Sequence, residues 1–247
     1  MKITQFKSQI NYLWLALATI SFQHAVLAQE QTANDAPRVI EIKAEREHLV
    51  DYQQPYEAAK KTQVASHGHV AFAYQLVPKN STTRIDDVKI WLESPSKSIP
   101  IKILDGNFFI VPVDDQIAEE KGKFAINKKG GEVTGVPSWI QVVPNKDWTI
   151  GLMKQVIDET NLAINKFLPW YGRPFAPKVK SIAVCSKEPS LEIQIKDGDK
   201  IAGSVVTKDA EKNDANRPVF CTRFDASTKF SDDSRVVVPD SAEVILM

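Results

Sequence analysis

Several signatures of common enzymes and nucleotide-binding proteins are missing from this 247-residue sequence. It has neither the G-x-S-x-G elbow of an α/β-hydrolase nor the H-E-x-x-H helix of a zinc protease. A phosphate-binding G-x-x-x-x-G-K loop and a dinucleotide-binding G-x-G-x-x-G fingerprint are also absent. Asp197-Gly198-Asp199 lacks the spacing and the terminal glutamate of an EF-hand loop. The motifs therefore identify no catalytic residue, no cofactor-binding residue and no metal ligand.

An excess of one charge is absent as well, because 31 basic residues balance 31 acidic ones. Removal of residues 1–28, which contain two lysines and no acid, would leave a formal charge of −2. Nucleic-acid-binding proteins normally carry a basic patch, or basic residues interleaved with aromatic ones. The overall balance predicts no nucleic-acid partner and argues against binding to an anionic membrane surface.

Apolar runs long enough for a membrane span are missing too. The run from Tyr12 to Phe22 is shorter than the roughly 20 residues that a spanning helix needs. It follows Lys2 and Lys7 and precedes a small-residue cleavage site that ends at Ala28. Residues 1–28 are therefore predicted to be a secretory signal peptide, with an uncleaved anchor as the alternative. Cleavage would give a soluble periplasmic or extracellular protein with no integral membrane segment, and residues 29–38 are expected to form a disordered leader.

Cysteine is scarce, with Cys185 and Cys221 as the only two. Their spacing excludes a C-x-x-C redox pair. Both lie in apolar, strand-like runs, and such a pair usually forms a disulfide in an oxidising compartment. We therefore predict a Cys185–Cys221 disulfide. A free catalytic thiol is the alternative, but no histidine lies near either cysteine in the sequence.

What the sequence does contain is a succession of short strands. Residues 39–144 alternate apolar and polar positions between turn signals, as an antiparallel sandwich or open barrel does. Asp105-Gly106 predicts a two-residue type I′ hairpin. That turn would place Ile103 opposite Phe108 and Ile101 opposite Ile110 in a meander that also includes Val88 to Glu93. The strand from Val70 to Leu76 is expected to join it, and Lys128-Lys129-Gly130-Gly131 predicts a second hairpin.

One helix is clearly predicted, from about Trp148 to Phe167. Its apolar residues fall within an arc of about 160° on a helical projection, and only Leu162 breaks the pattern. Asp147 is the expected N-cap, and Pro169 forbids continuation of the helix. One face of this helix should therefore be buried against a sheet.

The segment after the helix, LPWYGRPFAPKV, is rich in aromatic residues and proline. One interpretation is a connector whose rings cover the open end of a core. The other is a binding loop, in which Trp170 and Tyr171 offer stacking faces and Arg173 a fork for an anion. These three residues form the candidate ligand or partner loop.

The C-terminal residues 179–247 again alternate. Strands are predicted at 181–186, 191–195, 201–207, 219–224, 235–238 and 242–247, with a polar loop at 208–217. We therefore predict an α+β fold dominated by antiparallel sheet. It would comprise a β-rich domain (39–144), an amphipathic helix with its connector (145–178) and a smaller disulfide-linked β region (179–247).

Histidines and acidic pairs supply the remaining candidates for chemistry. His67 and His69 would point to the same side of a strand, but two ligands do not make a metal site, and His48 is the only other histidine after residue 28. Each acidic pair lies beside a predicted turn, where aspartate often bonds its own backbone. The pairs are Asp86-Asp87, Asp114-Asp115 and Asp232-Asp233.

The preferred functional hypothesis is a non-catalytic, exported protein of the periplasm or cell envelope that binds a protein or polymer or scaffolds an assembly. A first alternative is an exported hydrolase whose acidic pair, together with His67 or His69, assembles only in the fold. A second is a small-ligand carrier that uses the Trp170-Tyr171-Arg173 loop.

Overall fold

The structure is a computed structural model, and it describes residues 46–212 and 218–247. The expected signal peptide and leader, and residues 39–45 of the predicted β-rich domain, lie outside these residues. No helix in the described ranges is both long enough and apolar enough to cross a membrane.

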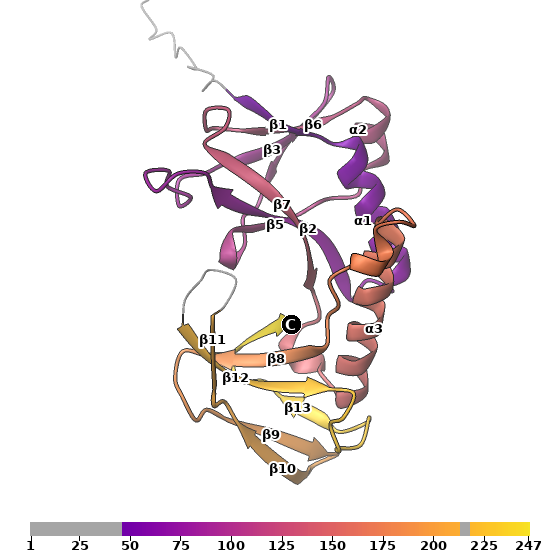
Figure 1. The fold of residues 1–247 in the computed structure, drawn as a ribbon, viewed down its shortest axis with the longest axis vertical. Coiled ribbons are helices and arrows are strands. Elements are labelled where there is room, and N and C mark those ends of the chain that lie inside the picture. Colours follow the sequence, from indigo (N-terminus) through magenta and orange to yellow (C-terminus); the bar gives the residue numbers. More distant parts are fainter. Residues whose placement is uncertain (1–45, 213–217) are drawn as a thin grey trace, which may run out of the picture. The chain divides into compact units, whose positions relative to one another are not determined.

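The described chain is an α+β fold in which every strand pairing is antiparallel, so the predicted fold class is confirmed. Figure 1 shows the strands and helices along the chain. The α-helices are α1 (Gln53–Ala65), α2 (Asp115–Glu119) and α3 (Ile150–Phe167).

The N-terminal β-rich half consists of two sheets that share one core. One sheet has the strand order β1-β6-β3-β4 and the other the order β5-β2-β7. The strands are β1 (Glu47–Asp51), β2 (Val70–Pro78), β3 (Ile90–Glu93), β4 (Ser98–Ile101), β5 (Phe108–Ile110), β6 (Lys123–Ile126) and β7 (Val133–Gln141).

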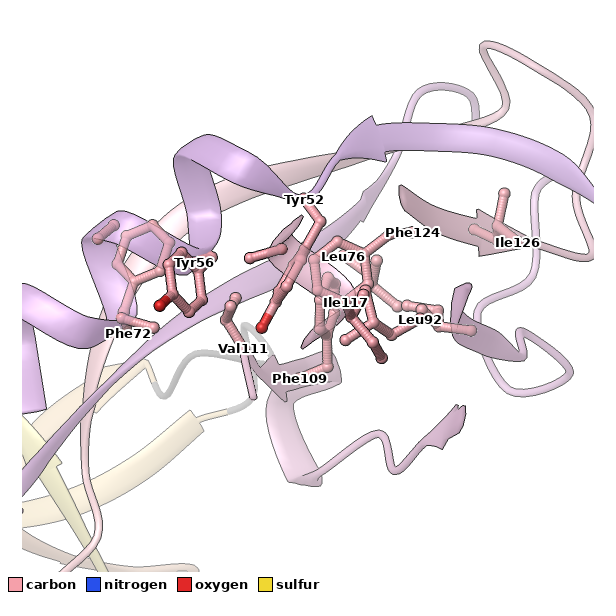
Figure 2. Packing of buried hydrophobic residues seen from close by; sticks show 14 of the residues in the cluster. Tyr52, Tyr56, Phe72, Leu76, Leu92, Phe109, Val111, Ile117, Phe124 and Ile126 are labelled. Carbon is pink, nitrogen blue, oxygen red and sulfur yellow. The ribbon is translucent and has the colours of Figure 1, made fainter. Parts of the chain in front are cut away.

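Large apolar side chains from both sheets form this core. Phe124 of β6 is fully buried, and its ring lies 5.2 Å from that of Phe109 of β5 and 5.6 Å from that of Tyr52. Figure 2 shows these rings gathered with Leu76 and Ile117. Side chains from two sheets and two helices thus share one core.

The turn at Asp105-Gly106 differs from the predicted hairpin. Leu104 bridges Phe108 across a three-residue turn, in which Gly106 has φ 76° and Asn107 has φ 66°. Because Asn107 also adopts the left-handed conformation, the turn gains one residue and the predicted register is wrong. Beyond the bridge the chain changes sheets, since β4 pairs with β3 whereas β5 pairs with β2.

The predicted hairpin at residues 128–131 is also wrong. Strand β6 pairs with β1 and β3, whereas β7 pairs with β2, so the glycine-rich turn connects two different sheets. Strand β2 was expected to join the meander. It pairs with β5, which belongs to the predicted meander, but it does not pair with β3.

Helix α3 confirms the predicted helix and its buried face. Its N-cap is Thr149, whose Oγ1 accepts a hydrogen bond from the backbone N–H of Leu152 at 3.1 Å. Asp147 is therefore not the cap and instead ends a short 3₁₀ turn (Asn145–Asp147). Leu162, the one residue that breaks the apolar pattern, is 45 % exposed. The buried residues of the helix include Ile150, Met153, Val156, Ile157, Ala163 and Ile164.

The C-terminal half consists of two further sheets, with strand orders β10-β9-β13 and β11-β12-β8-β14. Residues 209–212 of the expected polar loop form a strand, because their backbone completes the edge of the second sheet beside β12. The strands are β8 (Ser181–Ser186), β9 (Glu192–Asp197), β10 (Lys200–Val206), β11 (Asp209–Lys212), β12 (Pro218–Asp225), β13 (Arg235–Val237) and β14 (Glu243–Leu246).

The predicted disulfide is present within this half. Cys185 of β8 and Cys221 of β12 are directly opposite each other in the antiparallel register and are fully buried. Helix α3 packs against β8 and β12 through its apolar face, and it also contacts α1. The base of the aromatic connector is therefore fixed by a well-packed helix.

Candidate functional site

The aromatic loop (residues 168–177) begins where α3 ends and is shaped by a chain of short turns. The N–H of Leu168 donates to the C=O of Ile164 at 3.1 Å, which closes the helix. The N–H of Gly172 then donates to the C=O of Pro169 at 2.9 Å, and that of Phe175 to the C=O of Gly172 at 3.0 Å. The loop contains three prolines, whose rings fix φ. The loop backbone is therefore restrained before any partner arrives.

Its rings point away from the core. Phe175 is 86 % exposed, Trp170 78 % and Tyr171 65 %. The rings of Trp170 and Tyr171 meet edge to face with centroids 5.9 Å apart. The interpretation of these rings as a cover for the core is wrong, because most of their surface is in water. Aromatic side chains gain free energy from burial, so three exposed rings on one short loop are unusual for a connector.

Arg173 adds a positive charge to the same loop. Its Nε–H lies 3.4 Å from the C=O of Leu168, and within the described residues its guanidinium forms no ion pair. The sequence between Glu159 and Glu188 contains five basic residues and no acidic one. The overall composition does not indicate this local excess of basic residues among aromatic ones, because the charges of the whole chain balance.

A second cluster brings His67 and His69 together with Glu159, a residue that the sequence did not indicate as a candidate. Nδ1 of His67 lies 2.9 Å from one carboxylate oxygen of Glu159, and Nδ1 of His69 lies 2.9 Å from the other. The Nε2 amide of Gln155 also donates to this carboxylate at 2.8 Å. Glu159 is only 6 % exposed on α3, whereas the histidines belong to the turn between α1 and β2.

The electrostatics of this cluster favour a charged glutamate. Burial raises the pKa of Glu159, but hydrogen bonds from Gln155, His67 and His69 together outweigh it, so the pKa lies below its usual value. The carboxylate accepts an Nδ1–H from each imidazole, which fixes the tautomer and orients both rings. The neighbouring Ser66 hydroxyl is bonded to the carbonyls of Thr62 and Val70 instead. The cluster thus holds the 66–69 turn on α3.

The acidic pairs are each bound to a local partner, and none joins the histidines. Hydrogen bonds from the partners named at the end of this paragraph lower the pKa of four of these carboxyl groups, those of Asp86, Asp87, Asp114 and Asp115. The described residues contain no group of three or more His, Cys, Asp or Glu side chains suited to a metal ion. The partners are Arg84 for Asp86, Lys128 for Asp87, Lys97 and the Ile117 N–H for Asp114, Tyr56 and Lys60 for Asp115, and Lys154 for Asp232.

The small-ligand reading of the loop required a pocket lined by its aromatic residues. Pro177 does line a cavity of about 260 Å³, together with Trp139 and Val179, but Trp170, Tyr171 and Arg173 are not among its walls. These three side chains form a projecting surface, which suits a macromolecule better than a small ligand.

Comparison of the chain with family models, with curated proteins and with solved structures found no match. The function is therefore argued from the geometry of the sites.

Proposed function

We propose that this chain is an exported, non-catalytic binding protein that docks an acidic partner protein of the cell envelope through the aromatic loop. The observation that carries the proposal is the exposure of Trp170, Tyr171 and Phe175 on a loop braced by proline. No other described segment exposes three aromatic rings so close together in sequence.

The residue types are those that dominate binding energy in protein interfaces. Tryptophan, tyrosine and arginine are enriched at hot spots, where truncation to alanine costs about 2 kcal/mol or more. Side chains with few rotatable bonds lose little entropy on docking, and a loop restrained by proline loses less still. Trp170 and Tyr171 supply such rigid anchors, while Arg173 can form a bidentate pair with a carboxylate.

The charge of the loop region selects the kind of partner. The loop and its flanks carry four basic residues and no acidic one, which favours a partner surface rich in Asp and Glu; they are Lys166, Arg173, Lys178 and Lys180. Such complementarity raises the association rate and makes binding sensitive to salt. We infer that the partner presents an apolar pocket with an acidic rim.

Export is supported by two independent features. The first 28 residues have the basic start, apolar middle and small-residue end of a signal peptide. The Cys185–Cys221 disulfide is of the kind that persists in oxidising compartments.

Affinity capture with three forms of the mature protein tests the proposal. The variant Trp170→Ala/Tyr171→Ala/Arg173→Ala removes the proposed anchors. The control Val64→Ala/Ile201→Ala removes two other side chains, which are 71 % and 61 % exposed. All three forms should give the same circular dichroism spectrum and melting temperature, because the altered side chains lie on the surface.

Each form is immobilised, cross-linked to envelope extract of the producing organism and analysed by mass spectrometry; a retained protein is then purified and titrated. An acidic protein should bind the wild type and the control, and at least about 30-fold more weakly the loop variant. Equal binding to all forms would place the interface elsewhere. Capture of only a polysaccharide would overturn the partner class, and capture of nothing would overturn the binding function.

A further inference from the structure

A cavity of about 320 Å³ is lined by residues from both sheets of the N-terminal half. Strands β1 and β6 of one sheet and β2 and β7 of the other contribute to its walls. The glycine-rich connection between β6 and β7 closes one side. Its volume is at the lower end of the range of pockets that bind small molecules.

The floor of the cavity is apolar and rigidly packed. Ile126 and Val133 belong to the buried core, and Tyr74 packs against that core. The Tyr74 ring stacks on Phe109 with centroids 5.6 Å apart. A Cβ at Gly135 would lie 3.0 Å from Cδ1 of Tyr74, so the absence of a side chain there lets the ring rest against β7. Burial raises the pKa of Tyr74 further above neutral pH, so its hydroxyl is uncharged there.

The rim of the cavity is basic. Its lining includes three lysines and no acidic residue, and the Nε2 of His48, which also lines it, lies 2.9 Å from a carboxylate oxygen of Asp51. Within the described chain, Lys79 and Lys129 form no ion pair, whereas Lys128 pairs with Asp87 at 2.7 Å. The nearby Glu47 accepts a hydrogen bond from the backbone N–H of Gly130, which occupies one of its oxygens.

Backbone hydrogen bonds bring the two unpaired lysines to the same part of the rim. The N–H of Lys79 donates to the C=O of Glu132 at 2.9 Å, and the N–H of Glu132 donates to the C=O of Lys129 at 3.1 Å. Gly131, with φ 87°, makes this turn possible, and a Cβ there would meet nothing within 4 Å. The rim therefore carries two lysines that form no ion pair within the described chain, beside a turn with open space at Gly131.

We propose that this cavity binds a small amphipathic anion, namely a compact apolar or aromatic body that carries one carboxylate. The body lies against Tyr74, Ile126 and Val133, and the carboxylate lies between Lys79 and Lys129. Burial of the body supplies affinity, while the lysines set its orientation and select against neutral molecules. This site is separate from the aromatic loop, so it stands whether or not the loop binds a protein.

The test compares naphthalene-2-carboxylate with naphthalene-2-carboxamide, which has nearly the same shape but no charge. Binding to the full mature protein is measured by isothermal titration calorimetry and located by chemical-shift changes. The variant Lys79→Gln/Lys129→Gln removes the charge of the rim. The control Lys166→Gln/Lys178→Gln removes the same charge beside the aromatic loop, and Thr134→Phe fills the cavity from β7.

The carboxylate should bind at least about tenfold more tightly than the amide, and the Lys79→Gln/Lys129→Gln variant should remove that difference. Thr134→Phe should abolish binding of both probes, and the control should bind like the wild type. Equal affinities of the two probes for the wild type would overturn the proposal. So would loss of binding only in the control, shifts confined to residues 168–177, or no binding of the carboxylate up to about 1 mM.

Discussion

Removal of the Cys185–Cys221 disulfide should destabilise the protein by an amount set by the length of the loop that it closes. The two cysteines are 36 residues apart and join β8 to β12, next to each other in one sheet. In the chain-entropy model, opening a loop of this length increases the conformational entropy of the unfolded chain and lowers its free energy by about 4 kcal/mol. The strand pairing itself can persist without the bond, so the loss should come mainly from the unfolded state.

Equilibrium unfolding in guanidinium chloride measures this loss for the oxidised wild type, the reduced wild type and Cys185→Ala/Cys221→Ala. Both disulfide-free forms should lose about 4 kcal/mol, and their melting temperatures should fall by roughly 8 to 16 °C. If the two forms lose the same free energy of unfolding, the loss comes from the missing cross-link and not from the two sulfur atoms that the alanine variant also lacks. A decrease below about 1 kcal/mol in the reduced wild type would refute the entropic reasoning.

Three further predictions concern stability. Glu159→Ala removes the acceptor of three side-chain hydrogen bonds and should cost about 2 kcal/mol in urea unfolding, whereas Asp158→Ala, exposed on the same helix, should cost less than about 0.5 kcal/mol. Hydrogen bonds from nearby serine hydroxyls and a glutamine amide lower the pKa of Glu120 to about 2. The stabilisation of the folded protein by this carboxylate should therefore be complete above the unfolded pKa near 4.5 and should disappear as the pH falls towards 2. An NMR titration of the Glu120 carboxyl carbon with a midpoint near 4.5 would contradict this. Phe124→Ala should cost about 3 to 5 kcal/mol in thermal unfolding because its fully buried ring leaves a cavity, whereas exposed Val64→Ala should change stability by less than about 0.5 kcal/mol.

The sequence predicted elements whose cause is local. The helix α3 and the strands β8 and β12 arise from residues within each segment, and the structure confirms all three, although every residue of β8 is buried and its two faces do not alternate in exposure. The partners of strands were predicted less well. β4 and β5 are consecutive in the chain yet lie in different sheets, and the turn between them has its positive φ angles at Gly106 and Asn107 instead of at Asp105 and Gly106. Periodicity indicates that a segment is a strand, but pairing depends on contacts between distant segments.

The candidate sites likewise combine features that local sequence predicts with features that depend on contacts between distant segments. The residue types of the aromatic loop were visible in the sequence, but the exposure of Trp170 depends on how the loop leaves α3. Glu159 was missed because about 90 residues separate it from its histidine partners. One signal was available, since Glu159 lies seven residues after Leu152 and hence within about 20° of the apolar arc of the helix. An ionisable side chain beside a buried face needs a partner, and this position could have been identified on that basis.

Trp139 of β7 belongs to the surroundings of both large cores. It packs against the apolar cluster of the N-terminal half and against that of the C-terminal half, and its ring lies 5.5 Å from that of Phe72 and 5.4 Å from that of Phe167. Its indole N–H also donates to Thr62 of α1 at 3.2 Å. Local opening of either core would therefore expose apolar surface belonging to the other. The free energies of opening are coupled through this side chain, so amides in the two halves should share part of their protection from hydrogen exchange.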